Sequence, residues 1–216
     1  MYEAEILDVY RKCNIRNFPI DCEAIIRGFG FDLVSYEKLA KNHEEYKRLC
    51  LYSNDAFTSF EDRMICYNNR NIHTRIRFSL MHEIGHCVLQ TDDEDPADIF
   101  AANIIAPPAI ILHRKLKNAD EISRYFGMSI SAANNAVRGV RGYNIDDGAD
   151  LIDYFRSFCL ETDFRSVPVV QKSVRRRRTK RMRVFEEREA WILDNVPEVH
   201  DLAFRARERE AFFPFG

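Results

Sequence analysis

The sequence predicts an α+β fold in which a small core with a short antiparallel sheet is followed by a helical C-terminal region. Three observations carry this prediction. Apolar residues recur at helical spacing in 3–14, 20–29 and 74–89. Short runs with strand character lie between the last two of these segments, and the patterns beyond residue 96 are helical. Because 46% of the 216 residues are apolar, we expect a well-packed core.

The first half of the chain is expected to alternate helices and strands. Asp21 is placed to cap the helix over 20–29. The stretch FDLVSY (31–36) alternates apolar and polar residues like a short strand. Two apolar runs, Leu51–Tyr52 and Met64–Tyr67, flank a polar bend, and this pattern predicts a hairpin or meander.

The second half is expected to be helical. The first helix covers 74–89, and the next runs from about Pro96 to Ile105, where Pro107 and the proline after it would stop it. The stretch 118–139 predicts two helices joined by a glycine turn, as in a helix-turn-helix. A further amphipathic helix is predicted over 149–160.

Composition and charge argue against several classes of protein. A net charge of −2 is not that of a general polyelectrolyte binder. No apolar run approaches the roughly 20 residues that a membrane span needs, and the first residues do not resemble a signal peptide. The six cysteines are scattered and form no CxxC pair, which is typical of reduced thiols. We therefore expect a cytoplasmic protein without membrane contact and without a zinc–cysteine site.

The stretch RFSLMHEIGHCVL contains the motif HExxH. His82 and His86 are four residues apart and therefore share one face of a helix. Two neutral imidazoles in this arrangement can bind one zinc ion, and Glu83 is placed to act as general base on a zinc-bound water. A catalytic zinc keeps one position open and needs a third protein ligand. The motif thus predicts a metal-dependent hydrolase.

The residues around this motif resemble the ImmA/IrrE family of metallo-endopeptidases. The similarity rests on FSLMHEIGH followed by EDPADIFAANIIAPP, and on RMICYNNRNIHTRIRF upstream, within roughly residues 15–145. The resemblance implies a small zincin-like α+β core that holds Zn²⁺. It implies that His82, His86 and Glu94 are metal ligands and that Glu83 is the catalytic base. Asp98 would orient a ligand histidine through its other ring nitrogen.

The resemblance also implies a substrate. Members of the family cleave helix-turn-helix repressors of the Xre type, often encoded beside the peptidase in prophages, mobile elements or stress regulons. Cleavage would inactivate the repressor and derepress its genes. We therefore expect a zinc-dependent endopeptidase whose partner is a protein substrate of this type.

The third ligand is less well determined by the sequence than the two histidines. Only seven residues separate His86 from Glu94, and Pro96 disfavours helical dihedrals at Asp95. The short separation requires the chain to turn back within QTDD, which is possible for a link between helices. The proline favours a helix that is capped by Asp95 and begins at Pro96, with Glu94 just outside it. A helix that begins earlier, with the proline in its first turn, is the alternative. We prefer Glu94 as ligand, with Asp98 and then Asp95 as alternatives.

The strand over Met64–Tyr67 is expected to bind substrate. In zinc peptidases an edge strand near the site commonly pairs with an extended peptide. This strand leads into the helix of the motif, so we expect it to be that edge. The residues predicted to contact substrate are Ile65, Cys66, Tyr67 and Asn68.

The end of the chain carries a basic run, KSVRRRRTKRMR, with eight cations in twelve residues, among them those of Arg175–Arg183. Such a run attracts phosphates or an acidic partner, or is a solvated linker. Nucleic-acid binding through it is an alternative that we do not favour. An alternative function is a non-catalytic regulator that binds a repressor or DNA through the helical and basic C-terminal half.

These patterns divide the chain into three parts. Residues 1–110 are predicted to form the zinc peptidase core, and 111–160 a helical subdomain that resembles a helix-turn-helix. Residues 161–216 are predicted to form the basic linker and a C-terminal helix.

Overall fold

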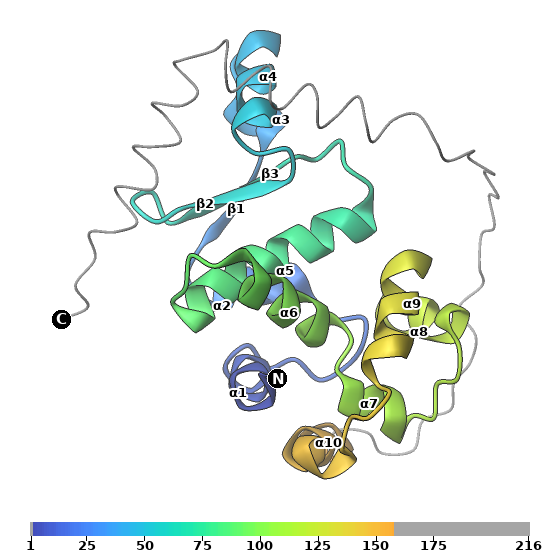
Figure 1. Cartoon of the computed structure of the whole chain (residues 1–216). Helices are drawn as coiled ribbons and strands as arrows, with labels where there is room; N and C mark the ends of the chain where they lie inside the picture. The colour runs from blue at the N-terminus through green and yellow to red at the C-terminus, as the bar shows by residue number, and fades with distance from the viewer. Residues whose placement is uncertain (1, 158–216) are drawn as a thin grey trace. The chain divides into compact units, whose positions relative to one another are not determined.

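A computed structural model of the chain describes residues 2–157, and these form an α+β unit (Figure 1). Its elements, in chain order, are α1 (Glu3–Lys12), α2 (Cys22–Gly28), β1 (Asp32–Ser35), α3 (Tyr36–Leu39), α4 (His43–Tyr52), β2 (Ala56–Ser59), β3 (Met64–Tyr67), α5 (His73–Leu89), α6 (Glu94–Ile105), α7 (Pro108–His113), α8 (Ala119–Phe126), α9 (Ile130–Gly139), the 3₁₀-helix η1 (Ile145–Gly148) and α10 (Ala149–Arg156). The predicted α+β class is confirmed.

The sheet has three strands in the order β1-β3-β2 and is mixed. β2 and β3 are antiparallel, as the prediction of a hairpin requires, but β1 pairs with β3 in parallel. The predicted short antiparallel sheet is therefore confirmed for the β2–β3 pair and wrong for the β1–β3 pair. A parallel pair needs a crossover connection, and here α3, α4 and β2 lie between the two strands along the chain.

Helices cover both faces of this sheet, and the alternation of side chains assigns each strand residue to one of them. Figure 1 shows α3 and α4 above the strands and α2 and α5 below them. Cys66 of β3 packs into the cluster with Tyr36 and Tyr46 of the upper helices. Its neighbour Ile65 belongs to the main core with α5. The sheet thus has a small aromatic cluster packed on one face and the main core packed on the other.

The main core is formed by side chains of helices from α1 to α10. Tyr10 and Phe126 are fully buried in it. Arg77 of α5 is also buried, and its guanidinium donates to the carbonyl oxygens of Ile20 at 2.8 Å and Phe126 at 3.3 Å. These charge-assisted bonds tie α5 to both the beginning and the later part of the chain, while Nε of Arg77 is buried without a hydrogen-bond partner among the described residues.

The helices α5 and α6 pack closely at Gly85. A Cβ added at Gly85 would lie 3.2 Å from the Cα and the carbonyl oxygen of Ala97 and 3.2 Å from a ring carbon of Phe100. Only hydrogen fits there without displacing α6, because contacts this short are tighter than ordinary van der Waals separations. The glycine inside HEIGH therefore permits the approach of the two helices that carry the candidate ligands.

Most helix predictions are confirmed to within a few residues. Asp21 caps α2 as expected, because its carboxylate accepts from the backbone N–H of Ala24 at 3.0 Å. The first strand of the hairpin is wrong: Leu51–Tyr52 ends α4, and the strand is Ala56–Ser59. The helix of the charged segment continues through these two residues, of which Leu51 is exposed and Tyr52 is half-buried.

The described residues fall within one compact unit, Met1–Thr162. The boundary predicted between residues 110 and 111 stays a prediction. The basic linker and C-terminal helix predicted for 161–216 lie outside the described residues, as does the basic run.

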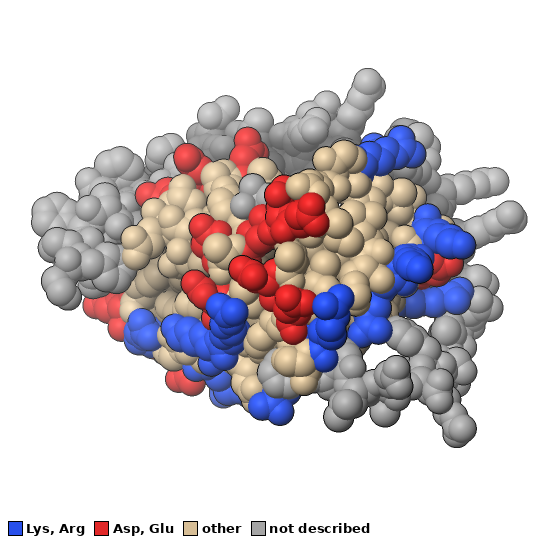
Figure 2. All heavy atoms as spheres, turned by 90° about the horizontal axis from the view of Figure 1, so that it is seen from below, with Lys and Arg blue, Asp and Glu red and all other residues tan. Residues whose placement is uncertain are grey.

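Among the described residues, one stretch, Glu94–His113, is long and apolar enough to cross a membrane by length and composition. It comprises α6 and α7, and 61% of its most apolar window is buried. This is weak evidence for a span, because the core helix of a soluble protein meets the same criteria. The surface seen in Figure 2 carries a central group of acids with lysines and arginines beside it. That face therefore lacks the continuous basic surface that a phosphate backbone favours.

Candidate metal and active site

The two histidines of the motif lie one turn apart on α5 and face each other. Their Nε2 atoms are 3.0 Å apart. The side chain of His82 is 15% exposed and that of His86 is 21% exposed, so both rings are held by their surroundings rather than by solvent. The expected placement on one helical face is what brings these two atoms together.

The outer nitrogen of each ring is held by an acceptor. His82 Nδ1 lies 2.7 Å from Oδ1 of Asp98, and His86 Nδ1 lies 2.7 Å from the carbonyl oxygen of Thr91. A carbonyl or carboxylate oxygen can only accept, so each Nδ1 carries the proton and donates. The Nε2 atom of each ring is then a lone-pair donor to a metal. Asp98 thus occupies the place predicted for a residue that orients a ligand histidine.

Glu94 lies beside the two histidines as a third candidate metal ligand, because α6 begins earlier than predicted. The helix starts at Glu94, with Asp93 before it, and the expected cap at Asp95 with a start at Pro96 is wrong. Pro96 falls in the first turn, where its missing N–H would have no intrahelical acceptor. Glu94 Oε2 lies 3.1 Å from His82 Nε2.

The donor set fits a metal ion. Ligand atoms of His82, His86 and Glu94 all lie within 4.8 Å of one another. Ligand atoms of a tetrahedral zinc, bound at about 2.0–2.1 Å, are separated by about 3.3 Å. Two imidazole lone pairs directed at each other beside a carboxylate repel one another unless a cation or proton lies between them. Among the described residues, the alternatives Asp95 and Asp98 are outside this group.

Glu83 lies beside the ligands and points toward the sheet. Its Oε2 accepts a hydrogen bond of 2.7 Å from the hydroxyl of Thr58 on β2. Burial raises the pKa of the Glu83 carboxyl, while the bond from Thr58 and the nearby histidines act in the opposite direction. A carboxylate made more basic by its surroundings is suited to accept a proton at neutral pH.

The strand predicted to bind substrate is not an edge. β3 is the middle strand, with β1 on one side and β2 on the other. Ile65 and Cys66 are buried, and the Asn68 side chain accepts from the Tyr46 hydroxyl at 2.6 Å and donates to the Asn54 carbonyl at 3.0 Å. The half-buried Tyr67 pairs with residues of both neighbours. The prediction is therefore wrong, because backbone pairing already occupies both sides of this strand.

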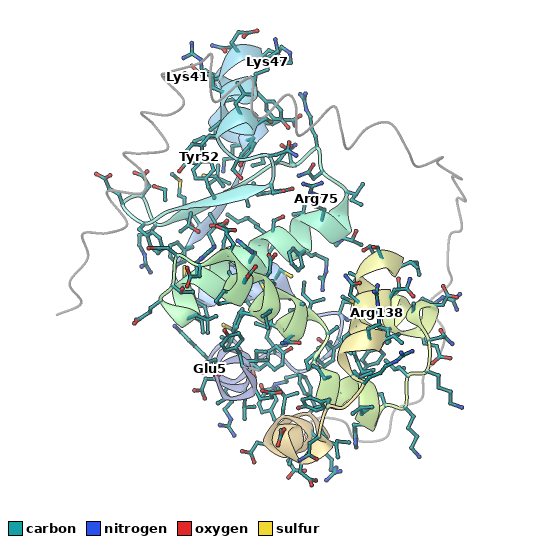
Figure 3. The ribbon with its side chains drawn as sticks, in the orientation of Figure 1. Glu5, Lys41, Lys47, Tyr52, Arg75 and Arg138 are labelled. Carbon is teal, nitrogen blue, oxygen red and sulfur yellow. The ribbon has the colours of Figure 1, made fainter. Side chains whose placement is uncertain are left out.

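The edge strand beside α5 is β2. Its start is fastened to the first turns of α5, since the Asp55 carboxylate receives two bonds from the Arg75 guanidinium, one of them 2.7 Å. Arg75 is labelled in Figure 3, between the sheet and this helix. Thr58 was not among the site residues predicted from the sequence, although the alternation of Phe57 and Thr58 is a weak strand signal.

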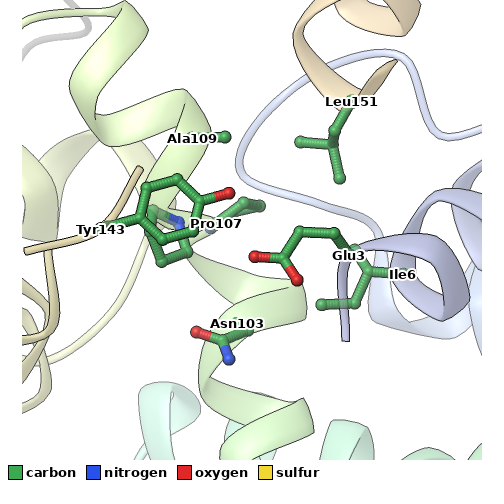
Figure 4. Close-up of a pocket in the computed structure, with 8 residues that line it drawn as sticks. Glu3, Ile6, Asn103, Pro107, Ala109, Tyr143 and Leu151 are labelled. Atoms are coloured by element: carbon green, nitrogen blue, oxygen red, sulfur yellow. The ribbon is translucent and has the colours of Figure 1, made fainter. Parts of the chain in front are cut away.

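The described residues also enclose a small cavity of about 10 Å³, away from the histidines (Figure 4). It lies where α1 meets α7 and α10, with Glu3 and Tyr143 directed into it. Its volume is about that of one water-sized probe, so it cannot receive a substrate side chain. Among the described residues, the candidate metal ligands lie instead on α5 and α6, and Glu83 lies beside β2.

An α+β core whose HExxH helix packs against an acid-bearing helix defines a zincin-like class of protein. Comparison with known families makes the assignment particular. Residues 33–138 match the family Peptidase_M78, described as the IrrE N-terminal-like domain. The chain therefore belongs to the ImmA/IrrE family of metallopeptidases. A search of curated proteins found no match to the chain.

Proposed function

We propose that the protein is a zinc-dependent endopeptidase that cleaves a helix-turn-helix repressor of the Xre type. The convergence of His82, His86 and Glu94 beside Glu83 carries the proposal. Two neutral imidazoles and one carboxylate are the donor set of many catalytic zinc sites, and they leave a fourth position open. The family of the chain supports a peptide bond as the target.

Each residue has a defined task in this mechanism. A bound zinc ion would supply a Lewis acid that acidifies water and polarises the scissile carbonyl. Glu83 takes the proton from the attacking water and passes it to the amine nitrogen of the leaving peptide. Asp98 and the Thr91 carbonyl keep both imidazoles in the ligating tautomer throughout.

The substrate would bind as an extended peptide along β2. This strand is an edge of the sheet, and it lies next to Glu83 through the Thr58 bond. An edge strand offers backbone N–H and C=O groups that do not depend on the peptide sequence. The repressor as substrate rests on the family alone.

The test uses the full chain with one equivalent of zinc and a helix-turn-helix repressor encoded beside it. We expect specific cleavage, detected by mass spectrometry of the fragments. Glu83→Gln should lower the cleavage rate by about 10²–10⁴-fold, the typical contribution of a general base, while zinc stays bound.

The outcomes separate the two functions considered. Absence of bound zinc under metal-replete conditions would overturn the enzymatic proposal and favour a non-catalytic regulator. Zinc binding without cleavage of the co-encoded repressor would overturn the proposed substrate. Cleavage that persists unchanged in Glu83→Gln would overturn the assigned mechanism.

A further inference from the structure

The register of β2 determines which of its backbone groups face outward. The N–H of Asn68 donates to the carbonyl of Asp55 at 2.8 Å. Opposite residues then run as Ala56↔Tyr67, Phe57↔Cys66, Thr58↔Ile65 and Ser59↔Met64. In an antiparallel ladder, hydrogen-bonded pairs alternate with pairs that are not bonded to each other. Phe57 and Ser59 therefore direct their N–H and C=O toward β3, and Ala56 and Thr58 direct theirs off the edge of the sheet.

The two outward-facing residues are not equivalent. The carbonyl oxygen of Ala56 accepts a hydrogen bond of 2.6 Å from the Ser53 hydroxyl, so a group of this chain already uses that acceptor. Thr58 lies one pleat further along, and its N–H and C=O face away from β3. A peptide that adds a strand to this edge would therefore form its pair of backbone hydrogen bonds at Thr58.

The side chain of the same residue faces the catalytic helix. Phe57 points to the opposite face, where its ring contacts Tyr36 and Tyr52 with centroids 5.8 and 5.0 Å away. Because side chains alternate along a strand, Thr58 points toward α5, where its hydroxyl donates to Glu83. The hydrogen bond engages Oε2 of Glu83, so the other carboxylate oxygen remains to accept a proton.

We propose that Thr58 is a positioning residue that links substrate binding to the general base. Its hydroxyl fixes the Glu83 carboxylate, and its backbone N–H and C=O bind the substrate backbone. One residue thereby sets both the register of the peptide and the position of the base. A fixed carboxylate avoids reorganisation during proton transfer, and small misplacements of such groups are costly to the rate. This inference rests on the proposed function.

Two substitutions distinguish the contribution of the Thr58 hydroxyl from that of the Thr58 backbone groups. Thr58→Val keeps the shape and the backbone groups but removes the hydroxyl, whereas Thr58→Ser keeps the hydroxyl. We expect Thr58→Val to lower kcat by about 10–100-fold with KM within about 3-fold, because base placement is lost and backbone docking is kept. Thr58→Ser should stay within about 3-fold of the wild-type kcat, because the hydroxyl that holds Glu83 is kept. Thr74→Val, the same substitution in the first turn of α5 and outside β2, is the matched control and should leave both constants unchanged.

A second measurement does not depend on activity. The thermal unfolding of the metal-free chain is compared for wild type, Thr58→Val, Glu83→Ala and the double variant. If the hydroxyl acts on Glu83, Thr58→Val lowers the melting temperature in the wild type and much less when Glu83 is already Ala. Equal shifts in both backgrounds would overturn the contact on which the inference rests.

The kinetic outcomes also distinguish this inference from the proposed function. If the zinc-loaded wild type cleaves and Thr58→Val retains its kcat, the positioning role is wrong and the endopeptidase stands. A loss that appears in KM, or as loss of bound zinc, also overturns the positioning role. If the zinc-loaded wild type does not cleave, the proposed function is wrong and the role of Thr58 falls with it.

Discussion

Two helix pairs in this molecule share the way in which the first helix ends but differ in how their helices begin. In both the α5–α6 pair and the α8–α9 pair, the first helix ends on a residue in the left-handed conformation. These residues are Gln90, with φ 51° and ψ 48°, and Gly127, with φ 65° and ψ 42°. The second helix then begins within a few residues in both pairs.

The pairs differ in how their helices begin. Asn118 and Ser129 cap α8 and α9, accepting from backbone N–H groups at 2.9 and 3.2 Å. Neither α5 nor α6 has a side-chain cap, although Asp93 stands at the start of α6. The acids of α6 reach the histidines instead, through Glu94 and Asp98. In one pair the acids at the start of the second helix thus belong to a candidate metal site, and in the other pair the residues at the helix starts act as caps.

The largest expected effect is on the third ligand. Glu94→Ala should abolish stoichiometric zinc binding, because two histidines alone do not make a catalytic zinc site. Its neighbour Asp95→Ala, outside the group of candidate ligands, should keep the metal. Elemental analysis of the purified variants measures both. Zinc retained by Glu94→Ala and lost by Asp95→Ala would reverse the assignment.

A smaller effect is expected at the acid that holds His82. Asp98→Asn should weaken zinc binding by about 10–100-fold, the usual cost of losing such a partner of a ligand histidine. Competition with a chromogenic chelator measures the affinity. Asp93→Asn is the control, since Asp93 makes no side-chain cap bond and lies outside the ligand group. Equal losses in the two variants would indicate a general charge effect.

The glycines of the two pairs offer a direct contrast. Gly85→Ala should destabilise the metal-free chain by about 1–3 kcal/mol, the range for overpacking, and should also weaken zinc binding because α6 carries Glu94. Gly127→Ala should cost about 1–2 kcal/mol for its left-handed backbone, with zinc affinity unchanged. Urea unfolding and zinc titration measure the two quantities. Unchanged zinc affinity in Gly85→Ala would show that α6 need not approach α5 this closely.

The smallest effect concerns the caps. Ser129→Ala should lower the free energy of unfolding by about 1 kcal/mol, the usual worth of a cap. Asp93→Ala should change it by less than about 0.5 kcal/mol, as expected for an exposed residue without such a role. Urea unfolding of the metal-free chain compares them. A larger loss for Asp93→Ala than for Ser129→Ala would remove the contrast between the two pairs.

The same contrast explains what the sequence could predict. The α8–α9 pair was predicted well because its glycine turn and the amphipathic pattern of its helices are local signals. The positions of His82 and His86 were also predictable, since four-residue spacing on a helix needs no distant contact. The start of α6 could not be predicted, because Asp95–Pro96 satisfies the ordinary rule for a cap followed by a first helical residue. The position of Glu94 beside His82 is a tertiary feature that overrides this rule.

The sheet was the least predictable part. Short strands carry little periodic signal, and the central position of β3 depends on β1, which lies about thirty residues away along the chain. The identity of the edge strand, and with it the role proposed for Thr58, follows from that distant pairing. Residue pattern alone could therefore name the strand that leads into α5 but not its place in the sheet.

The two histidines differ in which kind of mutation can remove the hydrogen-bond acceptor that orients each ring. His82 is oriented by a side chain, so a single substitution at Asp98 alters it. His86 is oriented by the main-chain carbonyl of Thr91, which every amino acid possesses. Its support is insensitive to most substitutions and sensitive to insertions or deletions in the short link between α5 and α6. Loop length, rather than residue identity, is thus the variable that would tune this half of the site during evolution.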